Sequence, residues 1–311
     1  MKILNLTNNE TSDIKFEVSK FPDGQQQVKI DLKSFHDISM FQSSYKNNEV
    51  KIKARLNNFK DLELIICATK SLRELGVKQI HLYTPYFLGS RSDRKFEEGS
   101  NNYLKDVICP IINSLELDSV TCLDPHSDVL EACLNNFKKV DNHALVKWAL
   151  NTYQFDNKKK SGSYYEDFVL ISPDAGANKK IFKLAEQIGY RGDIITCTKS
   201  RDENGQLSHV VVPLEMDLHY GEDFIIIDDI CDGGATFLNI AKAIKGYSKY
   251  WPYTPKIYLV VTHGIFSKGF KELNKYFDGI YCTNSYSDLN SPEMTLLNDN
   301  ELYKVKQLNI F

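Results

Sequence analysis

Short apolar runs alternate with longer amphipathic stretches along most of the chain. Runs of β-branched and other apolar residues predict strands at Leu64–Cys67, Ile80–Tyr83, Ser119–Leu123, Phe168–Ile171, Asp193–Cys197, Phe224–Ile227 and Ile257–Val261. Apolar residues at helical spacing predict helices at Asn178–Ile188 and Ala235–Ile244. Because strands that alternate with helices usually pair in parallel, this pattern predicts an α/β fold with largely parallel sheets.

The first 30 residues follow a different pattern. Their short apolar runs flank Pro22-Asp23-Gly24, a combination typical of a tight turn. We therefore expect short paired strands on the two sides of this turn, separate from the alternation of strands and helices that follows.

A polar stretch near the middle of the chain predicts a domain boundary. Residues 150–166 contain three consecutive lysines and a Ser-Gly-Ser, which is typical of a solvated loop and looks like an insertion. Each side of it has about 150 residues, enough to bury a core of its own. We expect two domains, 1–148 and 149–311, with the last segment packing back on the first domain.

Composition and charge narrow the class of protein. The chain has 311 residues and a net charge of −3, whereas a general nucleic-acid binder usually shows a strong basic excess. No apolar run approaches the roughly 18 residues of a membrane-spanning helix, and the start turns polar too early for a signal peptide. The seven scattered cysteines form no Cys-x-x-Cys pair, which argues against disulfides and structural zinc. We expect a cytoplasmic enzyme that binds neither nucleic acid nor a membrane.

The segment from Glu222 to Leu238 carries the most informative pattern. A run of apolar residues predicts a strand buried on both faces, which ends at Asp228-Asp229. Paired carboxylates at the carboxyl end of a parallel strand lie where open α/β sheets bind their ligands. The Gly-Gly turn at 233–234 leads into a helix, whose first N–H groups suit a phosphate. Acids beside a phosphate site predict a sugar phosphate, although Asp232 alone can equally be an N-cap.

Four other polar clusters follow predicted strands or turns. Residues 84–95 end in Arg-Ser-Asp-Arg-Lys, which suits phosphate binding or a solvated face. Asp124-Pro125-His126-Ser127-Asp128 suits a divalent metal or a polyphosphate, and residues 172–177 again combine an acid with small residues before a helix. Residues 198–202 place two cations on a polar segment that could close over a phosphoryl group or be an exposed hairpin. No Walker-type loop is present, so ATP would bind by another design.

Taken in order, these segments resemble the ribose-phosphate pyrophosphokinases, also called phosphoribosyl-pyrophosphate synthetases. The resemblance runs from about Phe21 to Thr283 and rests on FPDGQ, PYFLGSRSDRK, LDPHSD, SPDAGANKK, TKSR, DDICDGGAT and VTHGIFSKG. It implies two tandem phosphoribosyltransferase-type α/β domains, a homo-oligomer (a dimer or a hexamer) and Mg²⁺. The implied reaction moves the diphosphoryl group of ATP to the C1 hydroxyl of a ribose and releases AMP.

The same resemblance implies roles for individual residues. It assigns ATP binding to Phe21, Asp23, Gln25, Arg91, Ser92 and Asp93. It assigns catalysis to Lys199 and Arg201 on a flexible loop and to His126 near the ATP phosphates, with metal at His126 and Asp174. It assigns the ribose and its phosphate to Asp174, Asp228, Asp229, Asp232, Gly233, Gly234, Ala235 and Thr236. No residue is assigned as a general base.

The chain departs from the family pattern at the phosphate loop. Where the family has Asp-Thr-Ala-Gly-Thr, residues 232–236 read Asp-Gly-Gly-Ala-Thr, which removes a hydroxyl and a side chain and predicts a wider site. Such features look like a divergent branch found in phages and beside nicotinamide-salvage genes, some members of which are thought to pyrophosphorylate ADP-ribose for rebuilding NAD. The expected acceptor is therefore ADP-ribose, in a host cytoplasm if the protein is phage-encoded, with ribose 5-phosphate as the alternative.

Two alternatives of other classes compete with this interpretation. A non-catalytic regulatory homologue would be expected to lack loop cations or ribose acids, yet Lys199, Arg201, Asp228 and Asp229 are present. A phosphoribosyltransferase would need only one such domain and would leave the segment around His126 without a role.

Overall fold

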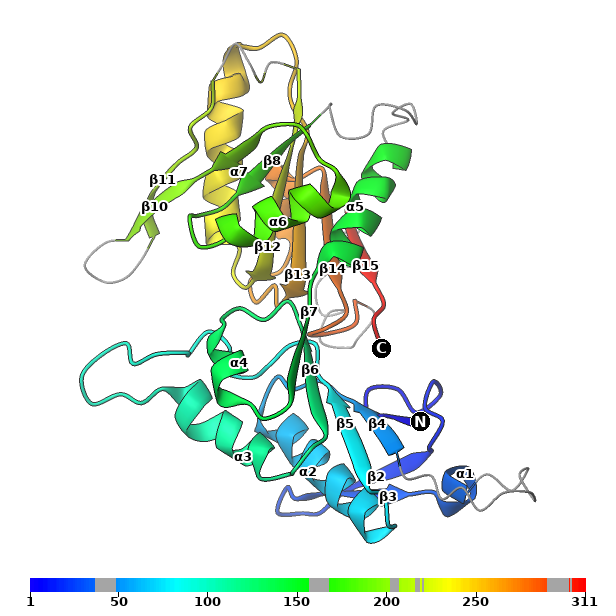
Figure 1. Ribbon diagram of the computed structural model, residues 1–311. Helices are drawn as coiled ribbons and strands as arrows, with labels where there is room; N and C mark the ends of the chain where they lie inside the picture. The colour runs from blue at the N-terminus through cyan, green and yellow to red at the C-terminus, as the bar shows by residue number, and fades with distance from the viewer. Residues whose placement is uncertain are drawn as a thin grey trace. The chain divides into compact units, whose positions relative to one another are not determined.

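A computed structural model describes residues 1–36, 49–156, 168–201, 207–215, 219, 221–289, 302 and 304–311. The chain separates into two compact units, Met1–Asp141 with Phe311 and Asn142–Ile310 (Figure 1). Phe311 groups with the first unit because its ring lies against the ring of Tyr83 and against the guanidinium of Arg55. Among the described residues, no helix has the length and apolar character needed to cross a membrane.

The first unit is built around a parallel sheet in the order β1-β4-β5-β6-β7. Its strands are β1 (Lys2–Asn5), β4 (Glu49–Lys53), β5 (Gln79–Tyr83), β6 (Ser119–Leu123) and β7 (Phe137–Val140). Its helices are α1 (Leu32–His36), α2 (Phe59–Glu74), the π-helix η1 (Leu104–Ile108), α3 (Cys109–Asn113) and α4 (Val129–Cys133). The expected hairpin is confirmed as β2 (Phe16–Lys20) and β3 (Gln26–Ile30), which form a separate antiparallel pair.

The strand expected at Leu64–Cys67 is wrong, because this run lies inside helix α2. The side chain of Asn58 accepts hydrogen bonds from the backbone N–H groups of Lys60 and Asp61 and so caps the helix. The buried residues of α2 recur three or four positions apart, as they do on one face of a helix. A window of four apolar residues was too short to show that period.

The second unit contains a six-stranded parallel sheet in the order β15-β14-β13-β12-β8-β9. Its strands are β8 (Phe168–Ser172), β9 (Ile194–Thr196), β12 (Asp223–Cys231), β13 (Ile257–Gly264), β14 (Gly279–Thr283) and β15 (Val305–Leu308). A separate antiparallel pair is formed by β10 (Thr198–Arg201) and β11 (Leu207–Val211). Its helices are α5 (His143–Asp156), α6 (Asn178–Ile188), α7 (Ala235–Tyr247), the 3-10 helix η2 (Ser248–Tyr250) and α8 (Lys271–Tyr276).

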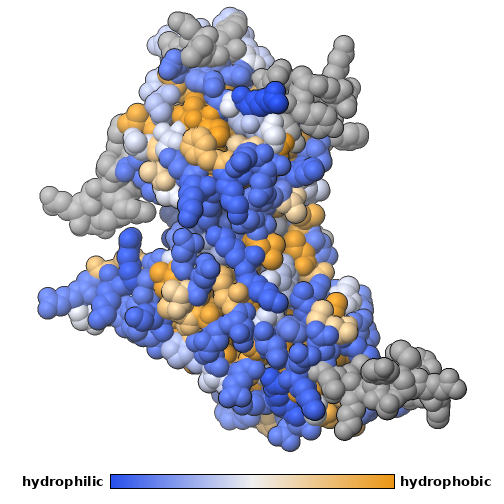
Figure 2. Space-filling view, viewed as in Figure 1, coloured by the Kyte–Doolittle hydropathy of each residue, from blue (hydrophilic) through white to orange (hydrophobic). Residues whose placement is uncertain are grey.

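Helices cover both faces of this second sheet. Phe224 and Ile226 of β12 pack in a cluster with α7, whereas the alternating Ile225 and Ile227 pack in a cluster with α5 and α6. Figure 1 shows the same division, with α7 on the opposite side of the sheet from α5 and α6. Hydrophilic residues dominate the visible surface of the described parts (Figure 2), since the apolar strands lie beneath the helices. The predicted α/β class with parallel sheets is confirmed.

The expected domain boundary differs from the observed division. The two units divide between Asp141 and Asn142, so a boundary between 148 and 149 would cut helix α5. Tyr153 of this helix is fully buried against Phe168 and Tyr258. Residues 151–156 are therefore helical and not part of a solvated loop, and the rest of the polar stretch, 157–167, lies outside the described residues.

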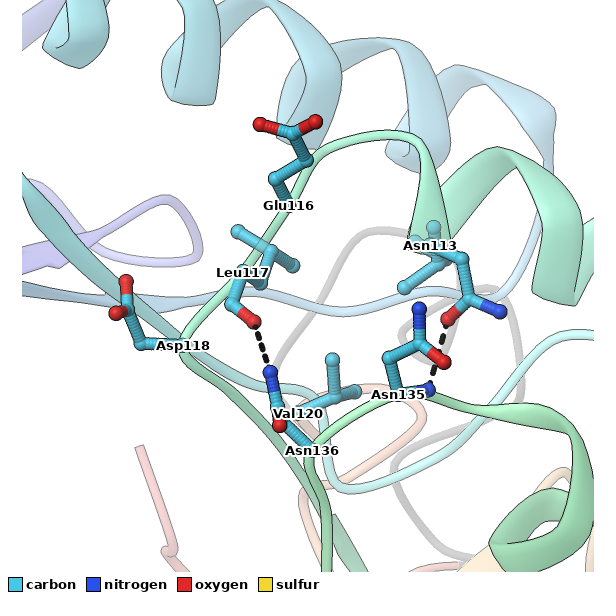
Figure 3. Close-up of a pocket in the computed structure, with 8 residues that line it drawn as sticks. Asn113, Glu116, Leu117, Asp118, Val120, Asn135 and Asn136 are labelled. Atoms are coloured by element: carbon cyan, nitrogen blue, oxygen red, sulfur yellow. Dashed lines mark hydrogen bonds between the residues drawn. The ribbon is translucent and has the colours of Figure 1, made fainter.

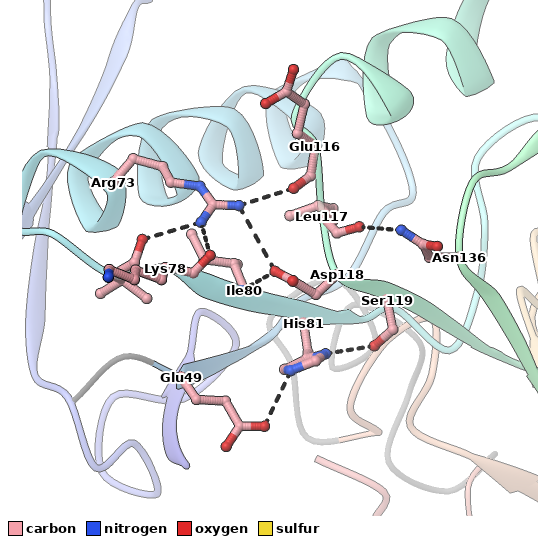
Figure 4. A network of polar contacts seen from close by, with 11 residues as sticks. Glu49, Arg73, Lys78, Ile80, His81, Glu116, Leu117, Asp118, Ser119 and Asn136 are labelled. Carbon is pink, nitrogen blue, oxygen red and sulfur yellow. Dashed lines mark hydrogen bonds and ion pairs between the residues drawn. The ribbon is translucent and has the colours of Figure 1, made fainter. Parts of the chain in front are cut away.

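Arg73 ties together the edge of the first sheet that contains the amino ends of β5 and β6 (Figure 4). Its Nη1 donates to the carbonyl oxygens of Val77 and Lys78, and its Nη2 donates to that of Glu116 at 2.9 Å. Asp118 accepts from the N–H of Ile80 at 2.7 Å and lies 3.9 Å from the same guanidinium.

Replacing Arg73 by methionine is expected to destabilise the protein by about 1–3 kcal/mol, because carbonyl groups at this edge lose charged donors. Urea unfolding followed by circular dichroism measures the change. Lys70→Met on the same helix is the matched control, since Lys70 is exposed. Equal stability of the two variants would contradict a structural role for the Arg73 contacts.

Candidate active site

The two acids of β12 lie within the strand and not after it. The expectation that the strand stops at Asp228 is wrong, because β12 continues to Cys231. Its pairing with β13 is what extends it: Asp228 is opposite Val261, and Ile230 is opposite His263. On the other side, pairing with β8 ends where Ile226 is opposite Ile171. Asp228 and Asp229 therefore lie at the carboxyl end of β12, where the neighbouring strand β8 has already turned away.

Two lysines from different elements reach the acids at this edge of the sheet. Lys180 of α6 donates to Asp229 Oδ2 at 2.9 Å, and Lys199 of β10 pairs with the carboxylate of Asp174. Asp174 is held in the loop after β8, because its Oδ1 accepts from the N–H of Ala177 at 3.0 Å. The structure thus brings together three sequence-predicted residues, Asp174, Lys199 and Asp229.

The carboxylates at this edge have opposite pKa shifts. Burial, followed by the charges of Asp229 and Asp174, raises the pKa of Asp228 well above its ordinary value. Burial also acts to raise the pKa of Asp174, but the hydrogen bond and charge of Lys199 outweigh it and lower that pKa. The site therefore holds more acid than its lysines neutralise, which favours binding of a cation or of hydroxyl donors.

The turn between β12 and α7 has the geometry of an anion site. Gly234 adopts a φ of 77° as the residue before α7, and no side chain caps that helix. The first N–H groups of α7 have no partner within the helix and carry its positive dipole end. Asp232 is not the N-cap, since its Oδ1 accepts from Ser267 Oγ at 2.6 Å.

The expectation of a wider phosphate site is wrong at both glycines. A Cβ at Gly233 would lie 3.3 Å from Cδ and Cε of Lys268, and a Cβ at Gly234 would lie 3.0 Å from a methyl group of Leu273. Neighbouring side chains thus occupy the room that the missing side chains leave. The sequence of residues 232–236 showed which side chains were absent, but it did not show that Lys268 and Leu273 fill the space beside the glycines.

Three of the residues assigned to ATP, Phe21, Asp23 and Gln25, lie in a closed turn at the tip of the β2–β3 hairpin. The N–H of Phe21 donates to the carbonyl of Gln25 at 2.9 Å, and Asp23 Oδ1 accepts from the N–H of Gln25 at 3.1 Å. Gly24, at a φ of 95°, closes the turn. Phe21 is 45% exposed, as a residue that stacks on a base would be in the free protein.

The other residues assigned to ATP lie at the carboxyl edge of the first sheet. Arg91, Ser92 and Asp93 follow β5, and the exposed His126 follows β6, the neighbouring strand. The N–H of Ser92 donates to the carbonyl of Gly89 at 2.8 Å, and the carbonyl of Asp93 accepts from Asn102 at 2.6 Å. Parallel strands that pair present their following loops side by side, so these residues share one edge.

A cavity of about 280 Å³ lies at the other edge of the first sheet (Figure 3). It is lined by Val120 of β6 and by residues that precede β6 and β7: Ile112, Asn113, Glu116, Leu117, Asp118, Asn135 and Asn136. Its amide side chains make hydrogen bonds within the protein: Asn136 Nδ2, for example, donates to the carbonyl of Leu117 at 3.0 Å. None of the predicted site residues line this cavity.

Among the residues that the structure describes, no three His, Cys, Asp or Glu side chains form a group that could hold a metal ion. Mg²⁺ is commonly held by one or two carboxylates together with substrate phosphates and water. The excess of acid around Asp174 and Asp228 fits such an ion better than a cage of protein ligands.

Sequence reasoning missed two lysines of this site. Lys180 was passed over although it stands in the quoted segment SPDAGANKK, as the third residue of the helix that follows Asp174. Lys268 stands in the quoted segment VTHGIFSKG but was given no role. The side chain of Arg201 and residues 202–206, expected in the flexible catalytic loop, lie outside what the structure describes.

Comparison with known proteins supports the resemblance. No protein-family model matches the chain. Curated ribose-phosphate pyrophosphokinases are similar to this chain over most of their length. That of Pyrococcus abyssi is 24% identical over 276 residues, which are 88% of this chain and 84% of the relative. That of Thermotoga maritima is 25% identical over 296 residues, which are 94% of this chain and 84% of the relative. The phosphoribosylpyrophosphate synthetase of Mycobacterium smegmatis has the same fold, with a TM-score of 0.73 and 16% identity over 100% of this chain and 95% of that one.

Proposed function

We propose that the protein is a Mg²⁺-dependent diphosphotransferase. It would move the diphosphoryl group of ATP to the C1 hydroxyl of a ribose that carries a 5-phosphoryl group, and release AMP. The observation that carries this proposal is the group of Asp174, Lys199, Asp228 and Asp229 beside the uncapped amino end of α7. The relatives with similar sequences are named for this activity on ribose phosphate.

Each part of this edge has a chemical task in the proposed reaction. The carboxylates of Asp228 and Asp229 accept hydrogen bonds from the ribose hydroxyls, and the first N–H groups of α7 hold the 5-phosphoryl group. The C1 hydroxyl gives up its proton to water and its oxygen forms a bond to the β-phosphorus, while the bond from that phosphorus to the bridging oxygen breaks and AMP leaves with that oxygen. Lys199 neutralises charge on the non-bridging oxygens during this step.

Asp174 would hold Mg²⁺ together with substrate phosphates, and His126 keeps the separate metal and ATP role that the resemblance implies. When bound, Mg²⁺ neutralises phosphate charge and lowers the pKa of the attacking hydroxyl. Lys199 pairs with Asp174 in the structure, so Asp174 would be able to hold a metal only when this lysine has turned from it toward the phosphates. No side chain is assigned as a general base.

Two acceptors meet this description. Ribose 5-phosphate is supported by the names of the relatives. ADP-ribose, with a role in rebuilding NAD and an origin in a phage-associated branch, was expected from the change to Gly233-Gly234, but Lys268 and Leu273 lie against these glycines, so the wider site behind that expectation is missing. Ribose 5-phosphate is therefore the leading acceptor, and ADP-ribose is the second candidate.

The test is release of AMP from Mg-ATP with each acceptor, followed by mass spectrometry of the product. A gain of one diphosphate on ribose 5-phosphate identifies the activity of the relatives, and the same gain on ADP-ribose alone identifies the second candidate. No AMP with either acceptor would contradict the proposal and favour a regulatory homologue. Light scattering with and without ATP tests the expected homo-oligomer.

A further inference from the structure

The segment after β13 is fixed against the phosphate turn by its backbone. The N–H groups of Ile265 and Phe266 both donate to the carbonyl of Cys231, at 2.9 and 3.1 Å. Ser267 Oγ donates to Asp232 Oδ1 at 2.6 Å, one residue before the glycine pair. The segment 265–268 therefore keeps its place beside the turn without help from a ligand.

The side chain of Lys268 lies across Gly233. Its Cδ and Cε are 3.3 Å from the position that a Cβ at residue 233 would take, and its Cγ is 3.6 Å away. A side chain at 233 would crowd this path, so glycine is the residue that lets the lysine lie there. Lys268 is exposed, and within the described part of the chain its ammonium makes no hydrogen bond or ion pair. A flexible cation thus stands next to an anion site with nothing in the described residues to neutralise it.

We propose that Lys268 binds the 5-phosphoryl group of the acceptor together with the amino end of α7. This inference rests on the proposed function and adds a residue to it. The N–H groups of α7 approach the anion along the helix axis, whereas Lys268 comes from the neighbouring β13 segment over Gly233. A lysine here supplies a charge-assisted hydrogen bond in place of the hydroxyl that the family pattern has at residue 233.

Lys268→Gln is expected to raise the KM for the acceptor at least tenfold, as loss of one charge-assisted hydrogen bond does. The kcat and the KM for ATP should stay within twofold of wild type, because the proposed contact is with the 5-phosphoryl group and not with ATP or the reacting atoms. Lys268→Arg should recover part of the loss. Lys249→Gln is the charge-matched control, since Lys249 lies beyond the other end of α7, about 20 Å along the helix.

Equilibrium binding of ribose 5-phosphate and of ADP-ribose, measured by calorimetry without ATP, separates this inference from the proposed function. Turnover by wild type with an unchanged KM in Lys268→Gln would overturn the role of Lys268 and leave the function intact. If wild type turns over neither acceptor, the proposed function fails and calorimetry tests the role of Lys268. Binding of an acceptor that is weaker in Lys268→Gln than in wild type supports the inference. Equal binding by the two proteins, or no binding by either, overturns it. Equal melting temperatures check that all variants fold.

Discussion

Lys199→Ala is expected to lower kcat for AMP release by about 10²–10³-fold, the usual cost of removing one preorganised group that stabilises charge in a transition state. Lys199 is placed for this task by β10, which pairs with β11, and by its contact with Asp174. The KM for the acceptor should change by less than threefold, because the ribose acids and the phosphate turn remain. Initial rates at saturating ATP and acceptor measure the effect.

The matched control for Lys199 is Lys179→Ala. Lys179 is an exposed lysine of α6 next to Lys180, so its loss changes the charge near the site by the same amount. The control should keep kcat within twofold of wild type. A Lys199→Ala enzyme with kcat within threefold of wild type would show that this lysine does not act on the transferred group.

Asp228→Asn is expected to lose about 10²-fold or more in kcat/KM for the acceptor, because a charged acceptor of the ribose hydroxyls becomes neutral. The same change should raise the melting temperature at neutral pH. In the fold, burial and the nearby carboxylates raise the pKa of Asp228, so its ionised form costs the native state free energy. Removing the charge removes that cost.

The sign of the pH dependence follows from this raised pKa. The native state holds the Asp228 proton more tightly than the unfolded chain, so its contribution to stability falls as pH rises through the raised value. The melting-temperature advantage of Asp228→Asn should be full above that value and should disappear below 3.8, the ordinary pKa of aspartate. Glu186→Gln, at an exposed position of α6, should show no such trend. A variant less stable than wild type at pH 8 would contradict the shift.

Local pattern predicted much of the second unit. Helix α6 begins and ends where the apolar spacing placed it, and β8 and β13 begin at the expected residues. These elements are long or uniformly apolar, so the pattern of apolar residues within each segment is enough to identify it as a helix or a strand. The run Leu64–Cys67 was misread because four apolar residues fit a strand and a buried helix face equally well.

The sequence by itself determined the chemistry that this protein can offer: the acids of β12, the Gly-Gly turn, the basic segment of β10, and their order along the chain. Only the tertiary structure decided which of these meet. It carried β12 past Asp228 by pairing it with β13, brought Lys180 to Asp229, and laid Lys268 over Gly233 from 35 positions further along the chain. The physical reason is that side-chain period and composition are local properties, whereas strand register and contacts between distant segments depend on packing of the whole unit.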